Sequence, residues 1–262
     1  MRRTRIAIAT IALLATVITA FRFASSAMGT ADETSIAIVV RTSGTAEVKS
    51  PSSSAWSRAA RGSKLDAQTS VRTGKGSNAI VLFNDGSVLR LDAQTEAKIL
   101  GTRTADGAYT QKQVAVSKGL LGFDVKASAS QPYRFSSPTA SAAIKGTQGT
   151  VEIGADGDLF SLVSSESDTA EIADVTLNSG GTSPLAIGEE VRATRAGAFE
   201  RRRLRAEELR ALASRIVERR SIRKQDLEDL RFKIREEAEE RRNDRDERRR
   251  KLEEERKQRQ GR

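Results

Sequence analysis

The sequence predicts a mainly β body followed by a long charged helix, and three observations support this fold class. Short apolar runs separated by turn residues extend from residue 36 to residue 193. An Asn-Asp-Gly-Ser motif at 84–87 separates two of these runs, which is typical of a β-hairpin. Finally, most of the residues at 200–262 are charged, and none is Pro. We therefore expect an all-β domain at 28–199 and a helical tail at 200–262.

The segment at 1–27 has the order of an export signal. Arginines at positions 2, 3 and 5 precede a long uncharged run, Ile6–Phe21, and small residues end the segment at Ala27. The run is shorter than the ~17–25 residues that span a bilayer as a helix. A signal peptide cleaved after Ala27 and an uncleaved N-terminal anchor both fit. Either one predicts a periplasmic or otherwise extracytoplasmic location for the rest of the chain, with no cytoplasmic domain.

The short strands continue along the whole predicted body, and we expect no long amphipathic helix between 35 and 195. The pentapeptide Leu-Asp-Ala-Gln-Thr at 65–69 recurs at 91–95. Stacked, solenoid-like turns and a coincidental sharing of strand–turn geometry both explain the repeat. The expected topology is therefore a compact sandwich or roll, or a short solenoid-like stack. The strand candidates are 36–40, 79–83, 88–91, 113–116, 122–125, 133–135, 150–153, 159–163, 171–177 and 189–193.

The tail at 200–262 is rich in strong helix formers. Two apolar stripes at helical spacing are separated by basic residues, and after Ala238 acids repeatedly stand one helical turn before bases. A stiff spacer or single solvated helix, a coiled-coil surface at 204–238 and a basic arm on an anionic surface all remain open. The members of the stripes are Leu209, Leu212 and Ile216, then Leu227, Leu230 and Ile234.

The net charge of +10 is distributed unevenly. In the body at 28–199 the basic and acidic residues nearly balance, whereas basic residues clearly outnumber acidic ones at 200–262. The overall basicity therefore does not indicate a globular nucleic-acid-binding domain. Aromatic residues make up only 4%, too few for a platform on which bases stack. Nucleic acid is not an expected partner.

The composition also limits the chemistry. The chain has no Cys and no His, which excludes Ser-His-Asp and Cys-His catalysis, imidazole or thiolate zinc sites and disulfides. The Asp156-x-Asp158 pattern lacks the further ligands of a calcium loop and indicates a hairpin turn instead. Paired carboxylates could hydrolyse glycosides, but nothing selects a pair. We expect no enzymatic activity, no catalytic residue, no metal site and no cofactor.

An ordered set of motifs over residues 35–165 resembles the FecR domain. Its first half is a Thr-Gly pair, an apolar strand at 79–83 and an Asp-Gly-Ser turn. Its second half is a Leu-x-x-Gly-like strand at 118–125 and a hallmark segment at 135–153, where Ser137 replaces the family's usual Thr and Gly149-Thr150 adds a second Gly-Thr. The motif residues are Thr73, Gly74, Asp85, Gly86, Ser87, Pro138, Lys145, Gly146 and Thr147.

The resemblance implies an extracytoplasmic β module similar to a sensing or protein-binding unit. The best-known proteins of the family are membrane-spanning regulators, with a cytoplasmic part that handles a sigma factor and a periplasmic part that receives a signal from an outer-membrane transporter. We expect this chain to lack the cytoplasmic part, so it would not use that direct route. The motif residues are expected to form turns and close backbone approaches rather than ligand contacts.

Together these observations predict an exported, non-enzymatic module of the cell envelope that binds a ligand or protein, with the tail as a spacer or assembly element. The expected partner is a protein or an envelope polymer, and the C-terminal helix offers a route to self-association. Membrane contact is expected only through an uncleaved N-terminal segment or an anionic surface. The alternatives are a structural envelope protein that self-associates and a carbohydrate-active enzyme.

Overall fold

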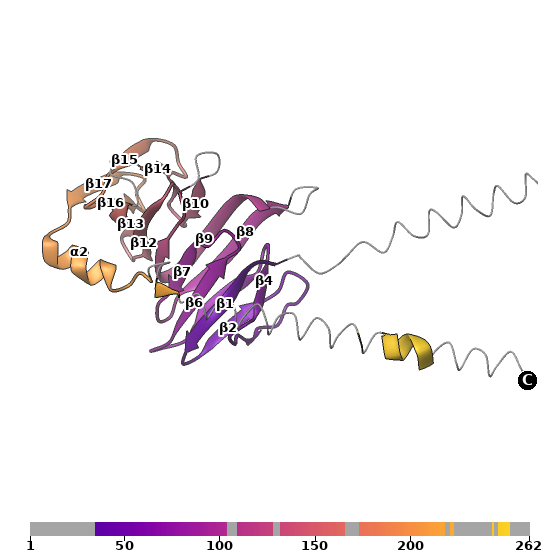
Figure 1. Cartoon of the computed structure of the whole chain (residues 1–262). Coiled ribbons are helices and arrows are strands. Elements are labelled where there is room, and N and C mark those ends of the chain that lie inside the picture. Colours follow the sequence, from indigo (N-terminus) through magenta and orange to yellow (C-terminus); the bar gives the residue numbers. More distant parts are fainter. Residues whose placement is uncertain are drawn as a thin grey trace, which may run out of the picture. The chain divides into compact units, whose positions relative to one another are not determined.

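The computed structural model describes residues 35–103, 109–127, 132–165, 173–217, 221–222, 243 and 246–251. Within 35–203 these residues form seventeen strands, and the short helix α2 (Ala206–Ala213) packs against them (Figure 1). The prediction of a mainly β body is confirmed, and the described residues between 35 and 203 contain no helix. Nowhere in the described chain is a helix both long and apolar enough to cross a bilayer. The predicted export signal at 1–27 lies outside the described residues.

The strands form two sheets, and sheet A is antiparallel throughout. In spatial order sheet A contains β4 (Lys64–Asp66), β1 (Ser35–Ser43), β6 (Asn78–Phe83), β7 (Val88–Leu91), β9 (Tyr109–Asp124), β12 (Thr147–Ile153), β13 (Gly157–Ser165), β16 (Glu189–Thr194) and β17 (Phe199–Arg203).

Sheet B shares the long strand β9 with sheet A. The first part of β9 pairs with β8 in sheet B, and residues from Gly119 onward pair with β12 in sheet A. In sheet B only the pairing of β9 with β10 is parallel. Its other strands are, in spatial order, β3 (Ser57–Arg58), β2 (Ala46–Lys49), β5 (Ser70–Thr73), β8 (Glu96–Arg103), then β10 (Tyr133–Ser136), β11 (Ala140–Ile144), β14 (Ala173–Leu177) and β15 (Thr182–Leu185).

One hydrophobic core lies between the two sheets. Strand β10 shows the alternation that builds it, since Tyr133 and Phe135 are buried and Arg134 is exposed. Phe135 stacks on Phe123 of sheet A with ring centroids 4.3 Å apart, and Tyr133 meets Phe83 edge to face at 5.4 Å. These aromatic contacts between sheets are the kind of pair that adds stability beyond the buried area.

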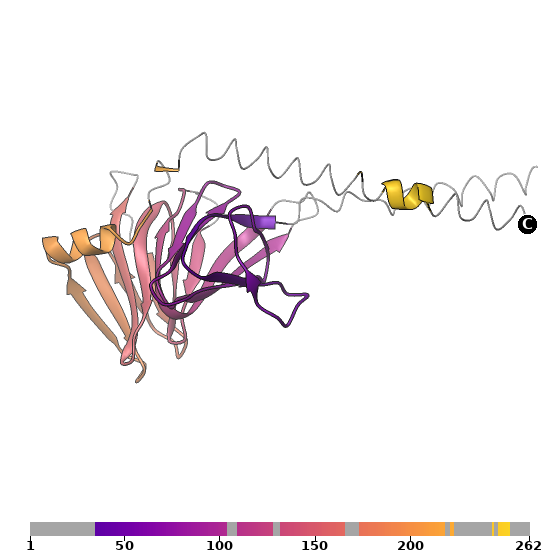
Figure 2. The ribbon, with the colours of Figure 1, turned by 90° about the horizontal axis from the view of Figure 1, so that it is seen from below.

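The chain advances along the body in sequence order while it alternates between the sheets. Figure 2 shows the first strands, in purple, at one end of the body and the last strands, in orange, at the other. Consecutive strands pair antiparallel in sheet A at β6–β7, β12–β13 and β16–β17, and in sheet B at β2–β3, β8–β9, β10–β11 and β14–β15. The two sheets are layered as in a β-sandwich. Successive hairpins follow one another along the body as in a solenoid.

The pentapeptide repeat marks two equivalent crossings from sheet A to sheet B. The first copy joins β4 to β5 and the second joins β7 to β8, and β5 and β8 are neighbours in sheet B. The Gln of each copy has a left-handed backbone, with φ of 71° at Gln68 and 53° at Gln94. The two copies therefore share a turn geometry but lie at opposite ends of the antiparallel β5–β8 pair, where Gln68 N donates to Ile99 O at 2.7 Å and Gln94 N donates to Gly74 O at 3.1 Å.

Two predicted turns are confirmed. At 84–87, Gly86 has a φ of 90° and the backbone N–H of Phe83 donates to the carbonyl of Ser87 at 2.8 Å, which closes the β6–β7 hairpin. The Asp156-Gly157 turn joins β12 to β13, where Gly154 N donates to Gly157 O at 3.2 Å. A similar motif at 106–107 lies outside the described residues.

The sheets end in strands that are short or carry residues unsuited to further pairing. The two ends nearest the N-terminus are the very short strands β3 and β4. At the other ends β15 contains Pro184, and β17 carries arginines at positions 201 to 203. Short strands, Pro and charged side chains all disfavour the addition of another strand at a sheet edge.

A strand crosses the predicted boundary between body and tail at 199/200. Strand β17 continues to Arg203 and pairs with β16, which places Glu200 opposite Arg192 and Arg202 opposite Glu190. Arg202 Nε lies 2.9 Å from the Glu190 carboxylate. These residues have a helix-like composition, but opposite charges directly across the strands favour the sheet.

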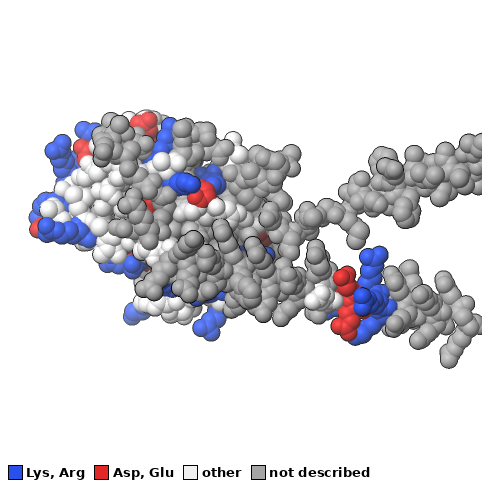
Figure 3. Space-filling model, in the orientation of Figure 1, with Lys and Arg blue, Asp and Glu red and all other residues white. Residues whose placement is uncertain are grey.

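The helix that follows is α2 (Ala206–Ala213), shorter than the predicted tail helix. It ends at Ser214, so Ile216 of the first predicted stripe lies beyond the helix and packs on sheet A instead. Figure 3 shows Lys and Arg side chains at the end of the body that β17 and α2 form. Farther on, 246–251 is helical and contains the predicted ion pair between Glu247 and Lys251, at 2.8 Å. The second stripe lies outside the described residues, and a long continuous helix is not supported.

Candidate functional site

The predicted motif residues lie at three places in the fold. The Asp-Gly-Ser and Lys-Gly-Thr motifs lie on either side of the chain that leaves β9. The backbone N–H of Lys126 donates to Ser87 Oγ at 3.0 Å, and that of Val125 donates to the carbonyl of Thr147 at 3.2 Å. The Thr73-Gly74 pair lies beside the second copy of the repeat, and Pro138 lies in the turn between β10 and β11.

Asp85 ties the Asp-Gly-Ser turn to sheet B. Its Oδ1 accepts the backbone N–H of Ser87 at 2.9 Å. Its Oδ2 accepts Lys112 Nζ at 2.6 Å and the Tyr133 hydroxyl at 2.7 Å. Burial acts to raise the pKa of Asp85, but these hydrogen bonds and the charge of Lys112 hold it below its ordinary value. The residue therefore stays ionised and joins the two sheets.

The Lys-Gly-Thr motif forms the tight turn that starts β12. Gly146 has a φ of 64°, and a Cβ there would lie 2.8 Å from the Cβ of Ala127. Thr147 is buried, and its Oγ1 has no hydrogen-bond partner within the described residues. Lys145 is exposed. Turn formation and close approach are thus the visible roles of this motif.

Pro138 belongs to a turn that is held from sheet A. The next residue, Thr139, donates through its N–H and Oγ1 to Oδ2 of Asp158, at 3.0 and 2.6 Å. Asp158 is fully buried and its Oδ1 pairs with Arg195 at 3.1 Å. Asn178 Nδ2 donates to the Pro138 carbonyl at 2.9 Å. Asp158, the second Asp of the Asp156-x-Asp158 pattern, therefore uses both carboxylate oxygens in contacts that hold the fold together.

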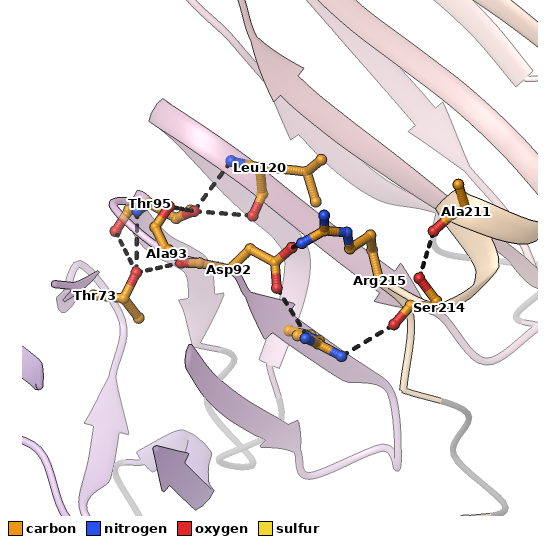
Figure 4. A network of polar contacts seen from close by, with 9 residues as sticks. Thr73, Asp92, Ala93, Thr95, Leu120, Ala211, Ser214 and Arg215 are labelled. Atoms are coloured by element: carbon orange, nitrogen blue, oxygen red, sulfur yellow. Dashed lines mark hydrogen bonds and ion pairs between the residues drawn. The ribbon is translucent and has the colours of Figure 1, made fainter. Parts of the chain in front are cut away.

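Thr73 and Gly74 hold the second copy of the repeat in place. Thr73 Oγ1 donates to the carbonyl of Asp92 and accepts the N–H of Thr95 at 3.0 Å (Figure 4). The Gly74 carbonyl accepts the N–H of Gln94 at 3.1 Å. Each of these bonds fixes the backbone of the turn at 91–95, and so it fixes the position of the Asp92 side chain.

The Asp92 carboxylate binds the segment that follows α2. It is 8% exposed and lies 3.0 Å from Arg90 Nε and 2.7 Å from Arg215 Nη1. Arg90 also donates from Nη1 to the carbonyl of Ser214 at 3.1 Å. Figure 4 shows the Asp92 carboxylate next to the guanidinium of Arg215. We call Arg90, Asp92, Gly122 and the residues that they contact, Ser214 to Ile216, the Asp92 site.

Gly122 provides the space for this contact. It lies opposite Arg90 in the β7–β9 pairing, on the outer face of sheet A. A Cβ at Gly122 would lie 2.2 Å from the carbonyl oxygen of Arg215 and 3.3 Å from Cα of Ile216. Only glycine allows the backbone at 215–216 to cross the sheet at this distance. Ile216 becomes 8% exposed there.

The segment after α2 also covers an apolar strip on sheet A. Ile80, Leu82 and Val88 form a second buried cluster, separate from the main core. Val217 and Ile222 pack against this cluster. The outer face of sheet A would expose this strip to water if the C-terminal segment were absent, so burial favours docking.

A polar chain holds α2 on the same face. Arg202 bridges Glu190 of β16, at 2.9 Å, and Glu208 of α2, at 2.8 Å. Hydrogen bonds from the Arg205 backbone and from the Arg202 and Arg205 side chains lower the pKa of Glu208 to about 2. The segment from β17 to the Asp92 site is therefore held by Arg202 where it begins and by Arg215 where it ends.

The arrangement joins the C-terminal segment to sheet A through charged groups. The carboxylate of Asp92 forms ion pairs with two guanidinium groups. Among the described residues no group of three His, Cys, Asp or Glu could hold a metal ion. The sequence alone did not reveal Asp92 and Arg215 as a pair, since 123 positions separate them. Repetition of the pentapeptide was the one signal that pointed to Asp92.

Comparison with known families supports the resemblance seen in the sequence. The family model described as FecR protein matches residues 69–168. The chain contains a FecR domain. Asp92 and Gly122 lie within the matched part of the FecR domain, whereas their partners at 214–216 lie beyond it. Thr73, Asp85, Pro138 and the remaining motif residues also fall within the match.

Two crystal structures of a candidate anti-sigma factor from Parabacteroides distasonis, at 1.65 and 2.50 Å resolution, resemble the chain. Each has 17% sequence identity and a TM-score of 0.45, over 54% of this chain. The aligned part spans 62% and 63% of those chains, which is less than two thirds of their length. No curated protein matches the sequence.

Proposed function

We propose that this chain is a non-enzymatic sensory module of the cell envelope, in which the FecR domain binds a protein or an envelope polymer. The observation that carries the proposal is the FecR match over 69–168, because the FecR family is one of regulators. The export pattern at 1–27 supports an extracytoplasmic location. The absence of His and Cys from the sequence supports a role without catalysis.

The Asp92 site gives this module a physical route from binding to output. The turn that carries Asp92 leads directly into β8, and the carboxylate holds the start of the charged C-terminal segment. A partner that shifts this turn changes the distance between Asp92 and Arg215. Because an ion pair weakens as its separation grows, docking of the C-terminal segment responds to such a shift.

The first test is fractionation of the producing cells with intact-mass measurement of the protein. The expected result is an extracytoplasmic protein whose mass corresponds to cleavage after Ala27, or the full mass with membrane association. Recovery of the intact chain from the cytosol contradicts the proposed location.

The second test measures hydrogen exchange of the purified protein with and without fractionated envelope components. A component that binds saturably should change the exchange of residues 214–217, and Asp92→Asn should expose the same residues in the absence of any partner. Saturable binding without a change at 214–217 contradicts the proposed output. Self-association alone, measured by sedimentation, favours the structural alternative, and turnover of a wall polysaccharide favours the enzyme alternative.

A further inference from the structure

A polar groove of about 530 Å³ lies on the outer face of sheet B. Its walls come from β8 to β11, with one residue from the turn that joins β4 to β5. The groove is well within the size range of small-ligand sites, about 300–1,000 Å³. The lining residues are Gln68, Leu100, Gly101, Thr102, Gln111, Lys112, Gln113, Pro132, Arg134 and Ala143.

Two strained residues shape this groove. In the described chain three residues other than glycine have a left-handed backbone, and two of them, Gln68 at φ 71° and Gln111 at φ 50°, line the groove. Gln111 lies where the register between β8 and β9 shifts, between Leu100 and Thr102 of β8. Such bulges redirect side chains, and strained non-glycine residues cluster at functional sites.

The lining carries positive charge without a carboxylate. Lys112 is neutralised by Asp85, 2.6 Å away. Arg134 is exposed and forms no ion pair with any described residue, and its Nη1 donates only a long bond of 3.4 Å to Ser141 Oγ. The groove therefore presents one guanidinium whose charge is not neutralised by a described residue.

Three amide side chains line the same groove as this guanidinium. Gln113 Nε2 donates to Ser136 Oγ at 3.0 Å, and Gln111 Oε1 accepts Thr102 Oγ1 at 3.2 Å, so both amides are held while retaining hydrogen-bonding capacity. Gln68 is exposed at the rim. Amides that both donate and accept complement the peptide backbone, and a guanidinium binds a carboxylate with two parallel bonds.

We propose that this groove binds a short acidic peptide segment, with Arg134 on its carboxylate and Gln68, Gln111 and Gln113 on its backbone. No aromatic ring lines the groove in the described part of the chain, so a saccharide would find no ring to stack on there. Leu100 and Ala143 offer small apolar contacts to the peptide's Cβ atoms. This inference deepens the proposed binding function and rests on it.

The test is a calorimetric titration of the purified protein with acetyl-Ala-Glu-Ala-Glu-Ala-amide and with the matched Gln peptide. We expect saturable binding of the Glu peptide and at least about tenfold weaker binding of the Gln peptide, because charge-assisted bonds to Arg are lost. Arg134→Gln should lower the affinity for the Glu peptide by about tenfold or more. The control is Arg58→Gln, which removes the same charge from an exposed position on the same sheet and should leave the affinity within about twofold.

A second variant separates binding from folding. Gln111→Gly removes one amide from the groove but keeps the left-handed backbone at no steric cost. The variant should therefore bind the Glu peptide more weakly without a lower melting temperature.

The inference is overturned by three outcomes: no saturable binding of the Glu peptide, equal losses in Arg134→Gln and Arg58→Gln, or tighter binding of an oligosaccharide of glucuronic acid through Arg134. These outcomes leave the envelope-binding test of the proposed function unaffected, because that test reads residues 214–217 on sheet A.

Discussion

The outer faces of the two sheets differ in composition and in what lies over them. On sheet A, Ile80, Leu82 and Val88 are apolar, and the chain's own segment after α2 covers them. On the outer face of sheet B, opposite charges alternate across five neighbouring strands. The members of this row are Arg58, Glu47, Arg72, Glu96 and Lys118, of which Arg72 and Glu47 form an ion pair of 2.7 Å.

The difference shows how one fold can separate two tasks. An apolar face must be covered in water, and here its cover is the start of the charged C-terminal segment, so the face is used for internal docking. A polar face with paired charges is stable when exposed, and it leaves the groove at Arg134 available to a partner. The FecR domain thus has one face directed to its own chain and one directed outward.

The largest expected effect comes from Gly122→Val, which removes the space that the docked segment uses. The new side chain would meet the carbonyl of Arg215, so the backbone at 215–216 must move away. We expect the free energy of unfolding to fall by about 3 kcal/mol, within the range for overpacked sites. Urea denaturation measures this loss, and hydrogen exchange at 214–217 should rise.

The control for this variant is Ala115→Val, which adds bulk to the half-buried outer face of sheet B on the same strand. It should change stability by less than about 0.5 kcal/mol. Unchanged protection of 214–217 in Gly122→Val would show that sheet A is not the docking face.

A smaller loss is expected from Asp92→Asn. The change leaves Arg90 and Arg215 without their common carboxylate, and we expect a cost of about 1–2 kcal/mol, reduced from the value for a fully buried pair because Arg215 is 53% exposed. The matched control is Asp66→Asn, since Asp66 holds the same place in the first copy of the repeat and forms no ion pair with a described residue. Equal losses in the two variants, measured by urea denaturation, would argue against a special role for Asp92.

The smallest expected effect is the contribution of Asp85 to the pH dependence of the free energy of unfolding. Its folded pKa lies below the ordinary value of 3.8, so its contribution to stability is complete above that value and disappears as the pH falls through the folded pKa. Asp85→Asn should therefore cost about 1 kcal/mol at pH 6 and progressively less below about pH 3.8. Urea denaturation at pH 6 and pH 3 tests this, and a difference that stays constant with pH would contradict the ion pair with Lys112.

Local signals in the sequence were sufficient for the hairpins and the β class. The Asp-Gly-Ser turn acts over a few neighbouring positions, and its positive φ at Gly86 follows from residue type alone. The end of the body could not be read in the same way. Residues 200–203 share the composition of a charged helix, and only their register against Glu189 and Glu190 makes them a strand.

The Asp92 site was beyond reach for a different reason. Arg215 is one of many basic residues at 200–262, and nothing near it in sequence distinguishes it from the others. Its partner is selected by the fold, which brings β7 and β9 together and places Gly122 under the crossing segment. The groove at Arg134 likewise depends on a register shift between β8 and β9. The alternation of apolar and polar residues in the sequence does not indicate this shift.

The end strands described above have a consequence for assembly. A body that lengthens by one hairpin after another has no built-in stopping point, and an open edge could join a second copy into a fibre. The very short β3 and β4, Pro184 in β15 and the arginines of β17 act as terminators at the four ends. The edges of the two sheets, rather than their interior, therefore disfavour the pairing of a second copy edge to edge.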